Sequence, residues 1–259
     1  MSDAWIRATV AIPFGLVVGS FLTVVVDRVP KKESIVSPRS RCPHCGADIR
    51  SRDNVPIVSY VTLGGRCRSC HSRISPRYPL LEGATAVAFV GVAIVYPSVY
   101  LIVLLSAFTA LMLAVAAIDL ELKVIPNAIT YPAVPAFAVA IMLGWAIGRE
   151  LDPLRSLMGA LAYGGVFLLI ALIAPRGLGM GDVKLTALIG LVMGSLGLRY
   201  VGVAAGSAIL LGGLGGIAAL LAGRGRKSAI PFGPFLAAGA LVATFWGERL
   251  ADWYLRSLS

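Results

Sequence analysis

Two aspartates stand at the ends of apolar segments, where a charged side chain is costly and needs a reason. Asp119 closes one such segment, and Asp182 opens another within the sequence Gly-Leu-Gly-Met-Gly-Asp-Val-Lys. Two carboxylates a few ångströms apart do not both ionise readily, so the pair shares a proton. The ionised member can take a proton from water while the protonated member donates to a carbonyl oxygen. The two aspartates are therefore candidates for a dyad that hydrolyses peptide bonds.

Other interpretations of these aspartates remain open from the residues alone. Each aspartate could simply cap or end a helix at the membrane surface, and Asp182 stands where a helix dipole favours an anion. Glu121, two residues after Asp119, is a competing partner for either carboxylate. The glycines before Asp182 allow a close backbone approach, which would suit an extended peptide substrate.

The four cysteines form two C-x2-C pairs, Cys42 with Cys45 and Cys67 with Cys70. Two residues between cysteines allow a tight turn that presents both sulfurs to one ion, and two such turns complete a tetrahedron. The spacing predicts a structural zinc site with Cys42, Cys45, Cys67 and Cys70 as its ligands. Disulfides are the alternative, and His44 or His71 could replace one cysteine as a ligand.

The composition of the chain predicts the membrane-spanning helices that position the aspartates and the cysteines. The chain has 259 residues, of which 58% are hydrophobic and 14% are charged, and its mean hydropathy of +0.84 indicates a membrane protein. Helices of about 20 apolar residues span a bilayer. Eight segments fit, at 9–26, 80–96, 100–118, 131–147, 154–174, 183–198, 200–222 and 232–250.

The predicted fold is therefore an all-α polytopic membrane protein with about eight transmembrane helices. A small zinc-binding cytoplasmic insertion lies between helices 1 and 2. The expected division is a first transmembrane helix (1–27), a cytoplasmic zinc-binding domain (28–79) and a seven-helix transmembrane domain (80–259). Glycines spaced four apart, as in the pairs 190/194, 202/206 and 212/216, are expected to let helices pack closely.

The net charge of +10 predicts the orientation in the membrane. If the eight segments alternate across the bilayer, 17 of the 23 lysines and arginines share the side of the 28–79 segment. The other six are Arg7, Arg149, Arg155, Arg199, Arg249 and Arg256. The positive-inside rule places the crowded side in the cytoplasm, together with both aspartates, and puts both termini outside. Disulfides are disfavoured in that compartment.

Several motifs in order resemble the prepilin peptidase family, membrane aspartyl proteases that process type IV prepilins and type II secretion pseudopilins. The matching stretches are 19–30, 41–45, 53–60, 65–70, 77–82, Asp119 with Ile125-Pro126, 179–184 and 230–235. The resemblance implies that Asp119 and Asp182 are the catalytic dyad. It also implies a supporting motif made of Gly179, Gly181, Lys184 and Pro126.

The resemblance further implies a function and a location. Members of the family cut a short basic leader at the cytoplasmic face of the bacterial cytoplasmic (inner) membrane. Those with the cysteine domain also N-methylate the new N-terminus with S-adenosylmethionine, for which no binding residues are predicted. The expected partners are prepilin or pseudopilin substrates and the lipid bilayer, with no nucleic acid. Thr23 and Asn127 depart from the family pattern, which has Asn and an acidic residue at these positions.

A polytopic transporter or a membrane scaffold with a structural zinc domain is the alternative function. Transport would predict polar residues near the middle of the spans, and the spans have almost none there. Nucleic-acid binding by the basic insertion is disfavoured, because that segment lacks a clear aromatic run on which bases could stack.

Overall fold

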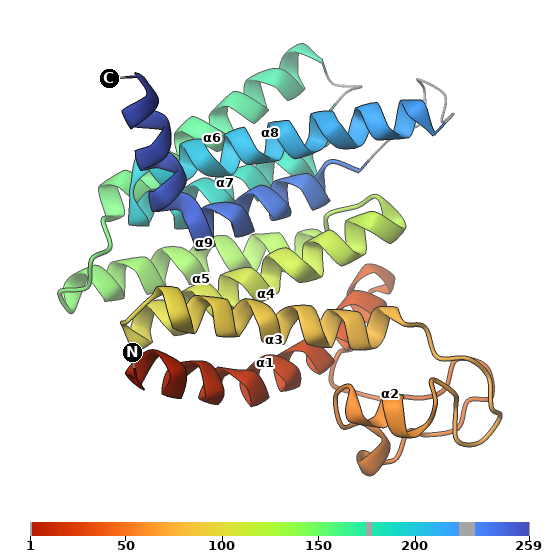
Figure 1. The fold of residues 1–259 in the computed structure, drawn as a ribbon. Coiled ribbons are helices and arrows are strands. Elements are labelled where there is room, and N and C mark those ends of the chain that lie inside the picture. Colours follow the sequence, from red (N-terminus) through yellow and green to blue (C-terminus); the bar gives the residue numbers. More distant parts are fainter. Residues whose placement is uncertain (1, 175–177, 223–230, 259) are drawn as a thin grey trace. The chain divides into compact units, whose positions relative to one another are not determined.

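A computed structural model describes residues 2–174, 178–222 and 231–258 of the chain (Figure 1). The described residues are helical, and no strand occurs among them. The helices are α1 (Ser2–Arg28), η1 (Val29–Lys31), η2 (Ser51–Asp53), α2 (Val58–Thr62), α3 (Arg77–Val95), α4 (Val99–Leu122), α5 (Asn127–Ala146), α6 (Pro153–Ile173), α7 (Met180–Leu196), α8 (Leu198–Leu221) and α9 (Gly233–Leu258). The all-α prediction is confirmed.

Each of the eight long helices among the described residues overlaps one of the eight predicted apolar segments, although the ends differ. Within the described ranges, six of them are long and apolar enough to cross a membrane, namely α1, α3, α4, α5, α6 and α8. Of the other two, α7 has only 17 residues, and the second half of α9 carries charged residues. Proline marks several boundaries, since it cannot continue a helix. Pro97 separates α3 from α4, and Pro153 begins α6.

The chain forms two compact units, Met1–Ala114 and Val115–Ser259. In the first unit, α1 lies along α3 (Figure 1). The contact is close because two residues of α1 are glycines. A Cβ atom on Gly15 would lie 2.5 Å from Ala86 Cα, and one on Gly19 would lie 2.7 Å from Glu82 Cα. The cysteine-containing segment connects these two helices.

In the second unit, α6 packs along α7 and α8 along α9. Gly159 and Gly190 face each other so closely that a Cβ on Gly190 would lie 2.2 Å from the Gly159 carbonyl oxygen. Gly194 packs similarly against α6, which confirms close packing for that pair of glycines. Gly202 and Gly206 have open space around them, so the predicted packing role is wrong there. A glycine spacing alone does not say which face of a helix meets a neighbour.

Some residues used in the sequence argument lie outside the described ranges. They are Arg176, Gly177, Arg224, Arg226, Lys227 and Ile230.

Candidate functional site

Asp119 lies in the last turn of α4 and is only 4% exposed. Its Oδ2 accepts a hydrogen bond of 2.9 Å from the backbone N–H of Gly233, the first residue of α9. The end of one helix is thus joined to the start of another, 114 residues away in sequence. A carboxylate is favoured near a helix N-terminus and disfavoured near a C-terminus. The Asp119 side chain therefore does not cap α4, although the residue does lie at the end of that helix, as the simpler interpretation expected.

Only glycine fits opposite Asp119. A Cβ atom on Gly233 would lie 2.5 Å from Asp119 Oδ2 and 3.0 Å from its Cγ, well inside normal contact. Glu121, the competing partner, is exposed at the end of α4, whereas Asp119 is buried. The burial distinguishes the two acidic residues, which the sequence alone did not.

Asp182 is the third residue of α7. Its Oδ2 accepts a hydrogen bond of 3.2 Å from the backbone N–H of Gly179, the residue that precedes the helix. Asp182 therefore does cap its helix, as the simpler interpretation predicted. Capping uses one carboxylate oxygen, so it is compatible with a second role for this residue.

The segment after Asp119 lies against the start of α7. A Cβ on Gly181 would lie 3.0 Å from Ile125 Cβ, so the glycine allows the two backbones to approach. Lys184 Nζ donates 2.9 Å hydrogen bonds to Asn127 Oδ1 and to the Tyr131 hydroxyl, and it lies 4.4 Å from the centre of the Tyr131 ring.

These contacts join the two predicted motifs. Pro126, the remaining member of the supporting motif, has extended backbone angles and precedes the first residue of α5. Its position turns the chain from the end of α4 into α5, beside the start of α7. The predicted catalytic and supporting residues are thus brought together at one end of the second unit.

An aromatic cluster fixes the start of α9. The Phe232 ring stacks on Phe167 of α6, with ring centroids 6.0 Å apart and planes at 26°. Gly212 of α8 makes room for it, because a Cβ there would lie 2.8 Å from Phe232 Cε2. Sequence reasoning noted the 230–235 motif only as a resemblance and missed the contact that Gly233 makes. A glycine between Phe and Pro at a helix start was the available signal.

The four cysteines form one cluster in the first unit. Their sulfur atoms all lie within 4.8 Å of one another, and those of Cys42 and Cys70 are 3.8 Å apart. Tetrahedral zinc with Zn–S bonds of about 2.3 Å needs sulfurs about 3.8 Å apart. The donor set and its spacing therefore fit zinc. Among the described residues this is the only such group, and neither His44 nor His71 belongs to it.

Matching hydrogen bonds shape the two cysteine turns. In the first turn, the N–H of Cys42 donates to the Ala47 carbonyl, and the N–H of Gly46 donates to the Cys42 carbonyl, each at 2.9 Å. In the second, the N–H of Cys67 donates to the Ser72 carbonyl at 2.9 Å, and that of His71 donates to the Cys67 carbonyl at 3.0 Å. Both turns also need a left-handed residue after the second cysteine, with φ of 71° at Gly46 and 58° at His71.

The surroundings favour the thiolate, the form that binds metal, at Cys42 and Cys70. A backbone hydrogen bond from Ala47 has the same effect at Cys45, but the Cys70 thiol and burial outweigh it and raise the pKa of Cys45 to about 11. Backbone N–H donation from Cys45 is the main cause that lowers the pKa of Cys42 to about 6, against the opposing effect of burial. The Ser72 hydroxyl lies 3.1 Å from the Cys70 sulfur and lowers the pKa of that thiol.

Two polar contacts tie the cysteine segment and its ends to the long helices, and sequence reasoning missed both. Asp27 at the end of α1 pairs with Arg77 at the start of α3 and accepts a 2.8 Å hydrogen bond from the Tyr78 hydroxyl. Glu82, buried on α3, accepts a 2.7 Å hydrogen bond from the backbone N–H of Ile57. Thr23, by contrast, donates to Ser20 in its own helix.

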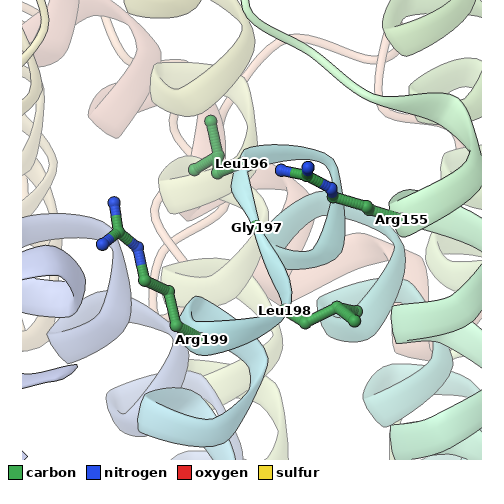
Figure 2. A pocket seen from close by; sticks show the side chains of 5 residues that line it. All are labelled: Arg155, Leu196, Gly197, Leu198 and Arg199. Atoms are coloured by element: carbon green, nitrogen blue, oxygen red, sulfur yellow. The ribbon is translucent and has the colours of Figure 1, made fainter. Parts of the chain in front are cut away.

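A shallow hollow of about 360 Å³ lies at the other end of α7 (Figure 2). It is about 21 Å from Asp182 along the helix, at 1.5 Å per residue. Figure 2 shows two arginines beside it, from α6 and α8. Arg155 pairs with Asp152, and Arg199 pairs with Glu248 and Asp252.

Comparison with known proteins agrees with this geometry. Residues 13–96 match the family model described as the bacterial peptidase A24 N-terminal domain, and residues 106–221 match that of the type IV leader peptidase family. The second match contains both aspartates, and the first contains all four cysteines.

Three of the similar proteins are named prepilin leader peptidase/N-methyltransferase. The protein from Bacillus subtilis is 36% identical, covering 94% of this chain and 96% of the relative. That from Burkholderia pseudomallei is also 36% identical, over 92% and 84%, and that from Pseudomonas aeruginosa is 32% identical, over 93% and 91%. No solved structure matches the chain significantly. Two family models and long, well-covered relatives agree, and the chain belongs to the type IV leader peptidase family.

Proposed function

We propose that this multi-pass membrane protein is a prepilin leader peptidase that also N-methylates the new N-terminus of its product. The observation that carries the proposal is the assembly of the two aspartate motifs at one end of the second unit. Asp119 is held by α9, Asp182 caps α7, and Lys184 links α7 to the start of α5. The relatives that carry this activity in their printed names extend over nearly the whole chain.

The proposed dyad shares one proton between Asp119 and Asp182. The ionised carboxylate takes a proton from water, and the resulting hydroxide equivalent attacks the carbonyl carbon of the scissile bond. The protonated carboxylic acid donates its proton to the carbonyl oxygen. Collapse of the tetrahedral intermediate breaks the C–N bond, and the leaving amine takes up a proton. The N–H of Gly233 keeps the Asp119 carboxylate in one orientation through this cycle.

The glycines of the second motif supply a place for an extended substrate. Gly179 and Gly181 precede and follow the start of α7, and neither has a side chain that would block the backbone of a peptide. A substrate helix must unwind before its amide can be attacked. We infer that these glycines border the path of the unwound segment.

The second proposed activity adds a methyl group to the amine that cleavage releases. S-adenosylmethionine would supply this group as an electrophilic methyl carbon, with S-adenosylhomocysteine as the leaving group and one proton released from the amine. The names of the relatives, which include N-methyltransferase, support this methylation activity. No step of leader cleavage depends on it.

The zinc ion is proposed to be structural. Cys42, Cys45, Cys67 and Cys70 would fill all four positions of a tetrahedral shell and leave none for water. The proposed organisation is a first transmembrane helix (1–27), a zinc-binding domain (28–79) and a seven-helix protease domain (80–259). The membrane is the bacterial inner membrane, with the zinc domain and the dyad at the cytoplasmic face and both termini outside.

Cleavage and methylation are tested together with the purified protein and a prepilin in detergent, with and without S-adenosylmethionine. Mass spectrometry distinguishes loss of the leader from gain of one methyl group, which raises the mass of the product by about 14 Da. Asp119→Asn and Asp182→Asn should each abolish cleavage, whereas the matched control Glu121→Gln should retain it. Cleavage at the wild-type rate by either asparagine variant would remove that residue from the dyad.

The orientation is tested separately by fusing a reporter after Ser259. Activity only on the extracytoplasmic side is expected, because eight spans return the chain to the side where it began. A reporter active in the cytoplasm would contradict the eight-span arrangement.

A further inference from the structure

We propose that Val58 and Val61 on one face of the short helix α2, with Val55 just before the helix, contact the lipid bilayer and anchor the cysteine segment to the membrane surface. The three valines are 45%, 55% and 69% exposed. Val58 and Val61 are three residues apart on the helix, so they lie on the same side. Ser59, between them, is buried. The helix thus turns its apolar side chains outward, which is unusual for a surface that faces only water.

The depth of α2 follows from its bond to α3. The N–H of Ile57, directly before α2, donates to Glu82 Oε2 at 2.7 Å. Glu82 is five residues into α3, about 7.5 Å from its start at 1.5 Å per residue. The 19 residues of α3 extend about 28 Å, so the helix needs its full length to cross about 30 Å of hydrocarbon. Ile57 therefore lies at the level of the lipid headgroups or slightly deeper.

The start of α3 has the residues of an interfacial anchor. Arg77 and Tyr78 are its first two residues, and both bind Asp27 at the end of α1. Aromatic and basic side chains are enriched at the level of lipid headgroups. Two long helices and the start of α2 are thus held together at one depth.

The backbone at Ile57 indicates that this position is maintained at a cost. Ile57 has φ 59°, a left-handed conformation that a β-branched residue rarely adopts. Such conformations are strained and persist only where their surroundings hold them. The hydrogen bond to buried Glu82 is the contact that holds Ile57, and the next residues direct the valine face outward.

The charge of the segment identifies the partner as an anionic lipid surface. Residues 28–82 contain eleven lysines and arginines and four acidic residues. Basic residues next to a membrane are attracted to anionic headgroups. Apolar side chains that enter the headgroup region beside such charges are typical of interfacial helices. This inference uses only the first unit and does not depend on the protease activity.

The test places a photo-crosslinking amino acid, benzoylphenylalanine, at position 61 of the full-length protein in vesicles of phosphatidylglycerol and phosphatidylethanolamine. The matched control carries it at Ser69, an exposed residue of the second cysteine turn. After irradiation, mass spectrometry of the peptides identifies lipid adducts. We expect at least a fivefold higher yield of lipid adducts at position 61 than at 69. Zinc content equal to that of the wild type confirms that both variants fold.

Equal lipid labelling at the two positions, or adducts only with protein at position 61, would overturn the proposal. A second arm replaces phosphatidylglycerol with phosphatidylcholine, which removes the anionic headgroups. We expect the lipid adducts at position 61 to fall severalfold. Labelling that does not depend on headgroup charge would overturn the role assigned to the basic residues.

Discussion

Replacing Gly233 by alanine tests whether the orientation of Asp119 matters for cleavage. The added Cβ would lie 2.5 Å from Asp119 Oδ2, whereas carbon and oxygen atoms in contact are normally more than 3 Å apart. One of the two must move by nearly 1 Å. The movement stretches or breaks the 2.9 Å hydrogen bond between the Gly233 N–H and the carboxylate.

The expected size of the effect follows from that bond. A hydrogen bond to a charged group contributes about 1.5–3 kcal/mol, and each 1.36 kcal/mol of lost transition-state stabilisation lowers a rate about tenfold. Gly233→Ala should therefore reduce kcat/KM for prepilin cleavage by roughly 10- to 100-fold. The free energy of unfolding should also fall, by up to about the same 1.5–3 kcal/mol, because the folded state loses this buried hydrogen bond.

The assay is cleavage of a prepilin by purified protein in detergent, with thermal unfolding measured on the same samples. Gly165→Ala is the matched control, because it adds the same methyl group to a described helix of the same unit with nothing within 4 Å. The control should cleave at the wild-type rate. A Gly233→Ala protein that cleaves as fast as the control would refute the reasoning that the Gly233 contact orients Asp119.

Three further predictions concern other contacts. Asn127→Asp should turn the hydrogen bond with Lys184 into an ion pair. The cleavage rate should stay within about twofold of the wild-type rate, and the free energy of unfolding should rise by at most about 1 kcal/mol. A loss of cleavage would contradict this. Cys67→Ser should lower the zinc content, measured by plasma mass spectrometry, from about one ion per chain to nearly none. Hydrogen bonds from Arg68 lower the pKa of Asp53. The pair therefore stabilises the folded protein above pH about 4. This stabilisation is lost as the pH falls through the lowered pKa of Asp53. Arg68→Ala should therefore shift acid unfolding to higher pH, followed by circular dichroism, and an unchanged midpoint would count against the pair.

The helices could be predicted from the sequence because their signals are local. Long apolar runs broken by proline gave all eight long helices to within a few residues at most ends. The largest error is at α9, which continues to Leu258 rather than ending near residue 250. The added residues mix apolar and polar side chains, and Asp252 among them pairs with Arg199 of α8, which also pairs with Glu248 before them. A hydropathy pattern does not register such a contact.

The contacts that shape the candidate site could not be predicted in this way, because each joins segments far apart in the chain. The bond from Gly233 to Asp119 spans 114 residues, and the bond from Lys184 to Asn127 spans 57. The cysteine cluster was predictable because both of its halves have the same C-x2-C spacing in the sequence. The hydrogen bond from Ile57 to Glu82 had no such signal, because almost every residue has a backbone N–H and the sequence does not show which one is used.

The bond between Gly233 and Asp119 has a consequence for biosynthesis. Asp119 and Asp182 both precede α9 in the chain, but the N–H that holds Asp119 belongs to the first residue of α9. A growing chain therefore carries both carboxylates for some time before Asp119 has its hydrogen-bond donor. The proposed protease site is completed only when α9 has been inserted. An incompletely made chain would thus hold a pair of acids in the membrane without being able to cut its neighbours.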